Sequence, residues 1–123
     1  MTFINISNHP SVYWDEKQLS EAGQYGEIID MPFPAISAMA GEEQIADLSG
    51  TFAEIIIEKY NPDDAVFHIM GELCFTFALV SRLQSKGYVC MASTTERIVE
   101  ETFPGRKEVY FQFVKFREYL KNL

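Results

Sequence analysis

The sequence lacks a long hydrophobic run, a basic and apolar leader, and any surplus of cysteine. No apolar run reaches the roughly 18 residues that a membrane-spanning helix needs, so we expect no membrane span. The N-terminal segment does not resemble a signal peptide. Cys74 and Cys90 both lie in apolar segments, which favours reduced core thiols and a cytoplasmic protein over a disulfide framework.

Positive charge is also scarce, with 10 Lys and Arg against 18 Asp and Glu and a net charge of −8. Residues 1–64 carry a balance of −10, and residues 65–123 carry +2. Long nucleic acid is disfavoured, because non-specific phosphate binding needs an extended basic surface. A small anionic ligand needs only a local positive site, and we expect most acidic residues simply to keep the surface hydrated.

Several catalytic signatures are missing. The chain has no G-x-G-x-x-G, no G-x-x-x-x-G-K-[ST] and no G-x-S-x-G, which disfavours a dinucleotide site, a P-loop and a hydrolase elbow. No His, Cys and Asp residues recur at metal-ligand spacing. We therefore expect neither a metal nor a cofactor, and the remaining possibilities are a metal-independent reaction or binding alone.

The hydrophobic pattern alternates between strand and helix along the chain. Short β-branched and apolar runs predict strands, and apolar residues at helical spacing predict helices. Alternation around Val109, Phe111 and Phe113, with a turn at Pro104-Gly105, predicts a C-terminal β-hairpin. The expected strands are 2–7, 27–31, 65–70 and 88–92, and the expected helices are 15–22, 41–60 and 73–86. The order predicts one α/β domain over residues 1–123: a Rossmann-like, mostly parallel sheet with helices on both faces and the hairpin at its end.

In open α/β sheets, ligands bind beyond the carboxyl ends of the strands. The first strand ends at Ser7, Asn8 and His9, and the third ends at Met70, Gly71 and Glu72. We expect the fourth strand to end at residue 92 and to present a loop of polar side chains. Hydroxyls, an imidazole, an amide and a guanidinium suit a phosphate-bearing ligand. The polar side chains of that loop are Ser93, Thr94, Thr95, Glu96 and Arg97.

Each candidate also has a purely structural interpretation. His9 could cap a turn, Glu72 could be an ordinary carboxylate in the first turn of a helix, and residues 93–96 could form a capping box. His68 lies inside an apolar strand, and we expect it to be a core residue.

Five stretches resemble the small stand-alone CRISPR-associated Rossmann-fold (CARF-like) proteins of type III systems. They are NISNHP at 5–10, IIDMPFP at 28–34, MGELCFTFALVSRL at 70–83, ASTTERIVEE at 92–101 and FVKFREY at 113–119. The resemblance implies a homodimer that binds cyclic oligoadenylate and, in the ring-nuclease type, cuts it without a metal. In that reaction a ribose 2′-hydroxyl attacks the adjacent phosphate and leaves a 2′,3′-cyclic phosphate.

The chemistry of that reaction suggests a role for each candidate residue. It requires in-line alignment, stabilisation of the phosphorane charge and an acid or base. We assign His9 as acid or base, Arg97 as phosphate clamp and Thr94 as a catalytic hydroxyl. Gly71 would allow close approach of the backbone to the ligand. The remaining ligand-binding candidates are Ser7, Asn8, Glu72, Ser93, Thr95 and Glu96.

Two other functions stay open. The chain could bind cyclic oligoadenylate or another small nucleotide without cutting it, as a sensor or sponge. It could instead be a small protein-interaction subunit that uses the aromatic C-terminal hairpin.

Overall fold

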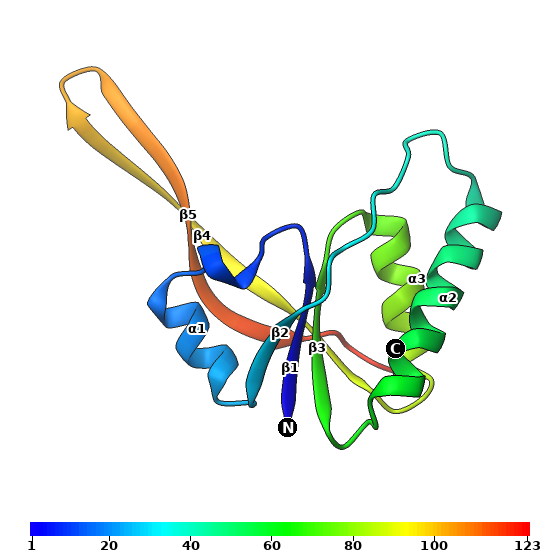
Figure 1. The fold of residues 1–123 in the computed structure, drawn as a ribbon. Helices are drawn as coiled ribbons and strands as arrows, with labels where there is room; N and C mark the ends of the chain where they lie inside the picture. The colour runs from blue at the N-terminus through cyan, green and yellow to red at the C-terminus, as the bar shows by residue number, and fades with distance from the viewer.

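The structure, a computed structural model, describes residues 1–123 as a five-stranded mixed sheet between two helical layers. Figure 1 shows α1 on one side of the sheet and α2 and α3 on the other. No helix is both long and apolar enough to cross a membrane. The elements in chain order are β1 (Thr2–Ser7), a short 3-10 turn (Ser11–Tyr13), α1 (Glu16–Gly23), β2 (Glu27–Asp30), α2 (Glu42–Lys59), β3 (Ala65–Met70), α3 (Leu73–Gln84), β4 (Val89–Phe103) and β5 (Arg106–Glu118).

The sheet has the strand order β2-β1-β3-β4-β5. The first four strands run parallel, and β5 pairs antiparallel with β4. The predicted α/β class with helices on both faces is confirmed. The sheet is mixed, however, because β5 turns back along β4 instead of entering through another crossover helix. The strand order reverses between β1 and β3, and such a switch point is where open α/β sheets bind ligands.

Two hydrophobic clusters hold the helices to the sheet. The larger one joins α2 and α3 to one face of the sheet and includes Ile56, Phe67, Phe75 and Leu79. Continuous burial of β1 and β3 on both faces explains their nearly unbroken apolar sequences. The smaller cluster covers the opposite face, and its buried members are Phe3, Trp14, Ala22, Val66 and Met91.

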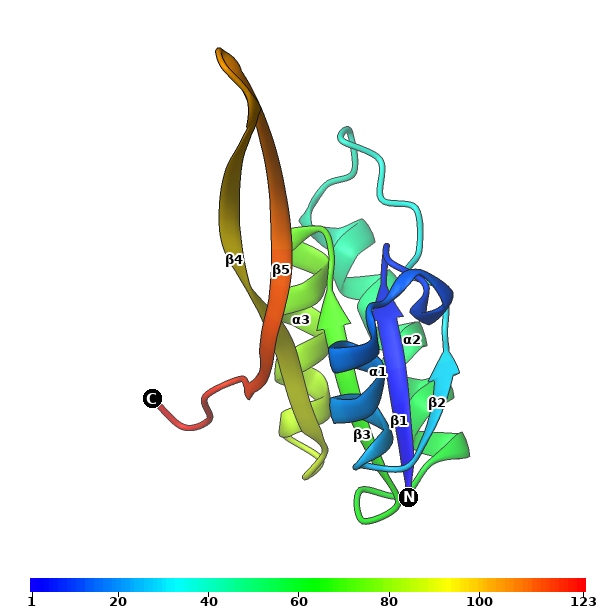
Figure 2. The ribbon, with the colours of Figure 1, turned by 90° about the vertical axis from the view of Figure 1, so that its left-hand side faces the viewer.

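The C-terminal hairpin departs most from the prediction. We expect a strand ending at residue 92 and a loop over residues 93–97, whereas β4 continues without interruption to Phe103. Only residues 89–91 pair with β3, and the rest of β4 pairs with β5 alone. Residues 96–112, which we call the arm, therefore project from the body as a two-stranded ribbon (Figures 1 and 2). The predicted turn at Pro104-Gly105 lies at the tip of the arm.

Two predictions about burial are wrong. Cys74 is exposed and only Cys90 belongs to the core, although both thiols are free. Apolar residues at helical spacing in 73–86 predict one buried face through Leu73, Phe77, Val80 and Leu83, but Leu73 and Phe77 are 83% and 78% exposed. Burial falls instead on the side of α3 that carries Phe75, Leu79 and Leu83, because this side faces β3 and α2.

Candidate functional site at the strand switch point

A pocket of about 460 Å³ lies at the carboxyl ends of β1 and β3, beside β4. Its walls come from the loop after β1, the end of β3, and the inner face of the β4–β5 ribbon. Two other pockets of about 520 and 510 Å³ lie along α2 and α3. The pocket at the strand ends is lined by Ser7, Asn8, His9, Trp14, Gln18, His68, Met70, Gly71, Ser93, Thr95 and Phe111.

A hydrogen-bonded network beneath this pocket is centred on the buried side chain of Asn5. The Asn5 amide nitrogen donates to Asp30 Oδ1 at 2.8 Å and to the His9 carbonyl oxygen at 3.0 Å. Both partners accept only, so the nitrogen of the amide must point toward them. The Asn5 carbonyl oxygen therefore faces the other way, where it accepts from the Ser7 hydroxyl at 2.8 Å and lies 2.9 Å from His68 Nδ1.

This orientation of Asn5 fixes the tautomer of His68. Because Asn5 Oδ1 can only accept, His68 Nδ1 must carry the proton and donate it. In the neutral ring, Nε2 is then unprotonated. It lies 3.2 Å from the hydroxyl of Ser93, which can donate to it. The Ser93 hydroxyl is also 3.1 Å from the Met70 sulfur, which is a much weaker acceptor.

The electrostatics of the network keep His68 neutral. Burial and the nearby His9 lower the pKa of His68 to about 4. Partial burial tends to raise the pKa of Asp30, but hydrogen bonds from Asn5 and Ser11 outweigh it and leave that pKa lowered. Asp30 thus remains an acceptor, and Ser11 binds it through both its backbone N–H and its hydroxyl. The site therefore holds the neutral imidazole of His68 and the anionic carboxylate of Asp30, which are joined through the side chain of Asn5.

The loop after β1 is held by its backbone, which leaves the His9 side chain exposed. The His9 carbonyl oxygen accepts from Asn5 and from the Trp14 indole N–H at 3.0 Å. The ring of Trp14 packs edge-on against His68 at 5.5 Å. The imidazole of His9 makes no recorded hydrogen bond and borders the pocket, so it is free to meet a ligand.

The structure brings six of the ten predicted site residues to this pocket. They come from three separate elements, as expected if the carboxyl ends of the strands converge. One of them has an additional structural reason: a Cβ at Gly71 would lie 2.3 Å from the ring of Phe33, so the glycine also makes room for that side chain. The six are Ser7, Asn8, His9, Gly71, Ser93 and Thr95.

The other four predicted residues do not line the pocket. Glu72 caps α3, where its carboxylate accepts from the Phe75 N–H at 2.7 Å. Thr94 and Glu96 project to the opposite face of β4 because strand residues alternate. The Thr94 hydroxyl is occupied by the backbone of Lys115, to which it donates and from which it accepts. The expectation that residues 93–97 form one loop around the ligand is therefore wrong.

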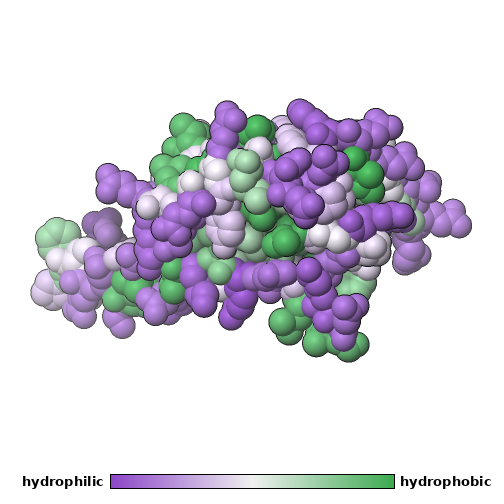
Figure 3. All heavy atoms as spheres, turned by 90° about the horizontal axis from the view of Figure 1, so that it is seen from below, coloured by the Kyte–Doolittle hydropathy of each residue, from purple (hydrophilic) through white to green (hydrophobic).

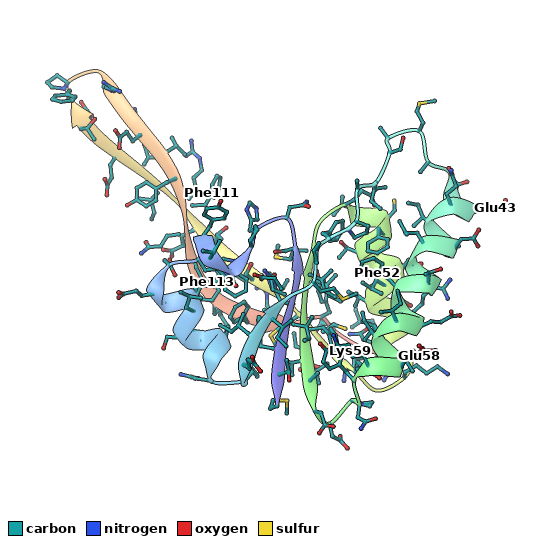
Figure 4. The ribbon with its side chains drawn as sticks, in the orientation of Figure 1. Glu43, Phe52, Glu58, Lys59, Phe111 and Phe113 are labelled. Atoms are coloured by element: carbon teal, nitrogen blue, oxygen red, sulfur yellow. The ribbon has the colours of Figure 1, made fainter.

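Arg97 has an intermediate position. It lies on the same side of β4 as Ser93 and Thr95, and it pairs across the ribbon with Phe111. Paired residues project to the same face of an antiparallel sheet, so Arg97 flanks an aromatic residue that lines the pocket. Phe111 itself is 67% exposed and lies where the arm leaves the body, with Phe113 next to the sheet (Figure 4).

Sequence reasoning missed several residues of the site. The sequence predicts that His68 is a core residue, and it is buried, but its two ring nitrogens join Asn5 to Ser93. A histidine inside a buried strand, next to an asparagine inside another, is the signal that could have indicated a polar network. The remaining lining residues missed are Trp14, Gln18 and Phe111. No three His, Cys, Asp or Glu side chains lie together as a metal site would need.

Fold and site together define a small α/β protein with a polar pocket at its strand switch point. The model of the uncharacterized protein MJ1673 family matches residues 1–117, so the chain belongs to that family. No curated protein and no solved structure matches the chain.

Proposed function

We propose that the pocket at the switch point binds cyclic oligoadenylate and cleaves it by attack of a ribose 2′-hydroxyl on the adjacent phosphate. One observation carries the proposal: the pocket gathers hydroxyls, an amide and an exposed imidazole where α/β sheets bind nucleotides. The resemblance of the sequence to CARF-like proteins supplies the ligand class. The overall negative charge argues against long nucleic acid as the ligand.

The walls of the pocket suit the base and ribose of a nucleotide. Phe111 presents an exposed ring, and stacking of a base on an aromatic side chain contributes roughly 1–3 kcal/mol. Asn8 and Gln18 carry amides that can pair with the hydrogen-bonding edge of adenine. Ser7 already donates to Asn5 and Ser93 to His68, so Thr95 is the hydroxyl left to donate to the ribose, and Ser93 can still accept from it.

The phosphate groups require positive charge that the pocket walls do not provide, since no Lys or Arg lines them. Arg97 pairs across the ribbon with Phe111, which lines the pocket. We assign it as the phosphate clamp because a guanidinium can form two parallel hydrogen bonds to a phosphate. His9, whose imidazole is free at the pocket, would donate the proton to the leaving 5′-oxygen.

The proposal includes a homodimer, which would place two copies of Arg97 around one ring. The arm supports it, because a two-stranded ribbon is only marginally stable in water without further packing. Figure 3 shows hydrophobic side chains among hydrophilic ones along the projecting arm. The exposed apolar residues of the arm are Val99, Phe103, Val109, Tyr110 and Phe111.

The charges of the arm fit a second copy of the same arm. Residues 96–112 carry four acidic and three basic side chains, and none of them belongs to an ion pair; the chain's only ion pair joins Lys121 to Glu118. Two arms that meet in antiparallel fashion would bring opposite charges together and cover the apolar residues.

Free thiols at Cys74 and Cys90 accord with a cytoplasmic location.

The test is incubation of the purified protein with cyclic tri-, tetra- and hexa-adenylate in EDTA. Chromatography reads the products, and a parallel titration reads binding. We expect linear products that end in a 2′,3′-cyclic phosphate. Tight binding without products would leave a sensor or sponge, and absence of both would refute the proposal.

Variants separate binding from chemistry. Arg97→Ala should weaken binding strongly, whereas Arg106→Ala, a matched arginine at the tip of the arm, should not. His9→Ala should slow cleavage by roughly 100-fold and leave affinity largely intact. Equal affinities of the two arginine variants would remove Arg97 from the site, and an unchanged rate would remove His9 from the mechanism.

A second candidate function is that of a protein-interaction subunit, favoured by the exposed apolar residues of the arm. Sedimentation equilibrium distinguishes the two. A stable dimer that Phe103→Ser disrupts, while Leu73→Ser on α3 does not, supports pairing between copies. A monomer at all concentrations would favour a different protein as the partner of the arm.

A further inference from the structure

The buried network contains an arrangement that binding of a nucleotide does not explain. Ser93, His68 and Asn5 form a chain of hydrogen bonds. The Ser93 hydroxyl lies 3.2 Å from His68 Nε2, and His68 Nδ1 lies 2.9 Å from Asn5 Oδ1. A nucleophile, a base and a group that orients the base within hydrogen-bond reach are the signature of an activated side chain. The three residues come from β4, β3 and β1, which are neighbouring strands, so the scaffold is rigid.

Each member of the set has the protonation state that its role requires. His68 Nδ1 carries the proton because the Asn5 carbonyl oxygen faces it, and Nε2 is left with a free lone pair. Asn5 is itself held by Asp30 and by the backbone of His9. Burial keeps the His68 ring uncharged, so the lone pair of Nε2 is available to the Ser93 hydroxyl. Ser93 borders the pocket and is the member that a ligand can reach.

We propose that Ser93 is a nucleophile, activated by His68 and oriented by Asn5, that reacts with an uncharged carboxylic ester bound in the pocket. The class of substrate follows from the walls around Ser93. No Lys or Arg lies in these walls, since Arg97 stands farther along the arm beside Phe111, and Trp14, Met70 and Phe111 offer apolar surface to an acyl or alkyl group. The side-chain amide of Asn8 is free to donate to the ester carbonyl oxygen.

The covalent step balances within the site. Ser93 Oγ forms a bond to the ester carbon while its proton passes to His68 Nε2. The bond from that carbon to the alcohol oxygen then breaks, and the alcohol leaves with the proton from His68. Water attacks the acyl group in the second half, gives its proton to His68 and releases the acid. The serine hydroxyl is restored when His68 returns the proton.

An apo-protein experiment tests this inference independently of cyclic oligoadenylate. The full chain is treated with an uncharged alkyl fluorophosphonate, which loses fluoride when an activated serine attacks its phosphorus. Intact mass and peptide mapping then identify the labelled residue. We expect one adduct per chain, on Ser93, and a burst of p-nitrophenol when p-nitrophenyl acetate is the substrate.

Variants show whether the label reports activation. Ser93→Ala should abolish labelling, and His68→Gln should slow it roughly 100-fold or more, since general-base assistance contributes at least that factor. Ser20→Ala is the control, because Ser20 is an exposed serine of α1 outside the pocket and its loss should change nothing. Circular dichroism checks that each variant is folded.

The wild-type mapping decides the question even if His68→Gln does not fold. Absence of an adduct, or adducts spread over Ser20 and other exposed serines at similar rates, would overturn the inference. A Ser93 adduct in a protein that ignores cyclic oligoadenylate would refute the proposed function and leave this inference standing. Cleavage of cyclic oligoadenylate by a protein that forms no Ser93 adduct would support the proposed function and overturn this inference.

Discussion

Lowering the pH should destabilise the fold through His68. The pKa of this histidine is about 4 in the folded chain against an ordinary value of 6.5, because burial disfavours the charged ring. Between these values the unfolded chain binds a proton that the folded chain does not. The stability contributed by neutral His68 is therefore complete above pH 6.5 and is lost progressively as the pH falls toward 4. A difference of this size corresponds to a loss on the order of 3 kcal/mol.

Urea unfolding at half-unit steps from pH 7.5 to 4.5 measures this effect. The wild-type protein should hold its stability down to about pH 6.5 and lose it from there to pH 4.5, with a slope that approaches the uptake of one proton on unfolding. His68→Gln should start less stable, because its network is altered, but should be nearly flat between pH 6.5 and 5. His9→Gln, which removes the exposed histidine instead, should keep most of the wild-type slope. Parallel slopes for wild type and His68→Gln would refute the argument that His68 is buried and neutral.

Three further predictions concern packing, capping and thiol access. Gly71→Ala should cost about 1–3 kcal/mol in thermal or urea unfolding, because the new Cβ would press on the Phe33 ring; an unchanged midpoint would contradict this. Glu72→Ala should cost about 0.5–2 kcal/mol by removing the cap of α3, and it should leave ligand affinity intact, which titration checks. A thiol reagent should modify exposed Cys74 in the native protein and Cys90 only after unfolding, since burial raises the Cys90 pKa to about 12; two equally fast thiols would be incompatible with the structure.

The helices could be predicted because their apolar residues recur at helical spacing, and the parallel strands because short, nearly continuous apolar runs mark them. The expected strands 2–7 and 65–70 coincide with β1 and β3, and the helix expected over 41–60 becomes α2 at Glu42–Lys59. The rule that ligands bind at the carboxyl ends of parallel strands then located the pocket without any motif. It placed His9 and Ser93 at one pocket although 84 residues of sequence separate them.

The extent of β4 could not be predicted in the same way. Residues 93–97 are all polar, so they show no apolar face, and a run of Ser, Thr and Glu before Arg97 is equally typical of a helix start. What makes them a strand is the pairing with β5, which is a long-range contact. The role of His68 was hidden for a related reason: its position in an apolar strand indicates burial, whereas its partners Asn5 and Ser93 come from distant strands.

The continuation of β4 through the pocket has a consequence for function. Ser93, Thr95 and Phe111 line the pocket, and Arg97 lies beside Phe111. All four side chains project from one face of the same ribbon. A ligand that contacts Phe111 therefore also contacts the base of the arm. A second copy packed on the arm would then change the affinity of the pocket for that ligand. Dimerisation and ligand affinity should be coupled, and the coupling must be reciprocal. If Phe103→Ser yields a monomer that binds cyclic oligoadenylate as tightly as the wild-type protein does, the arm serves association alone, and the pocket of one copy is sufficient for binding.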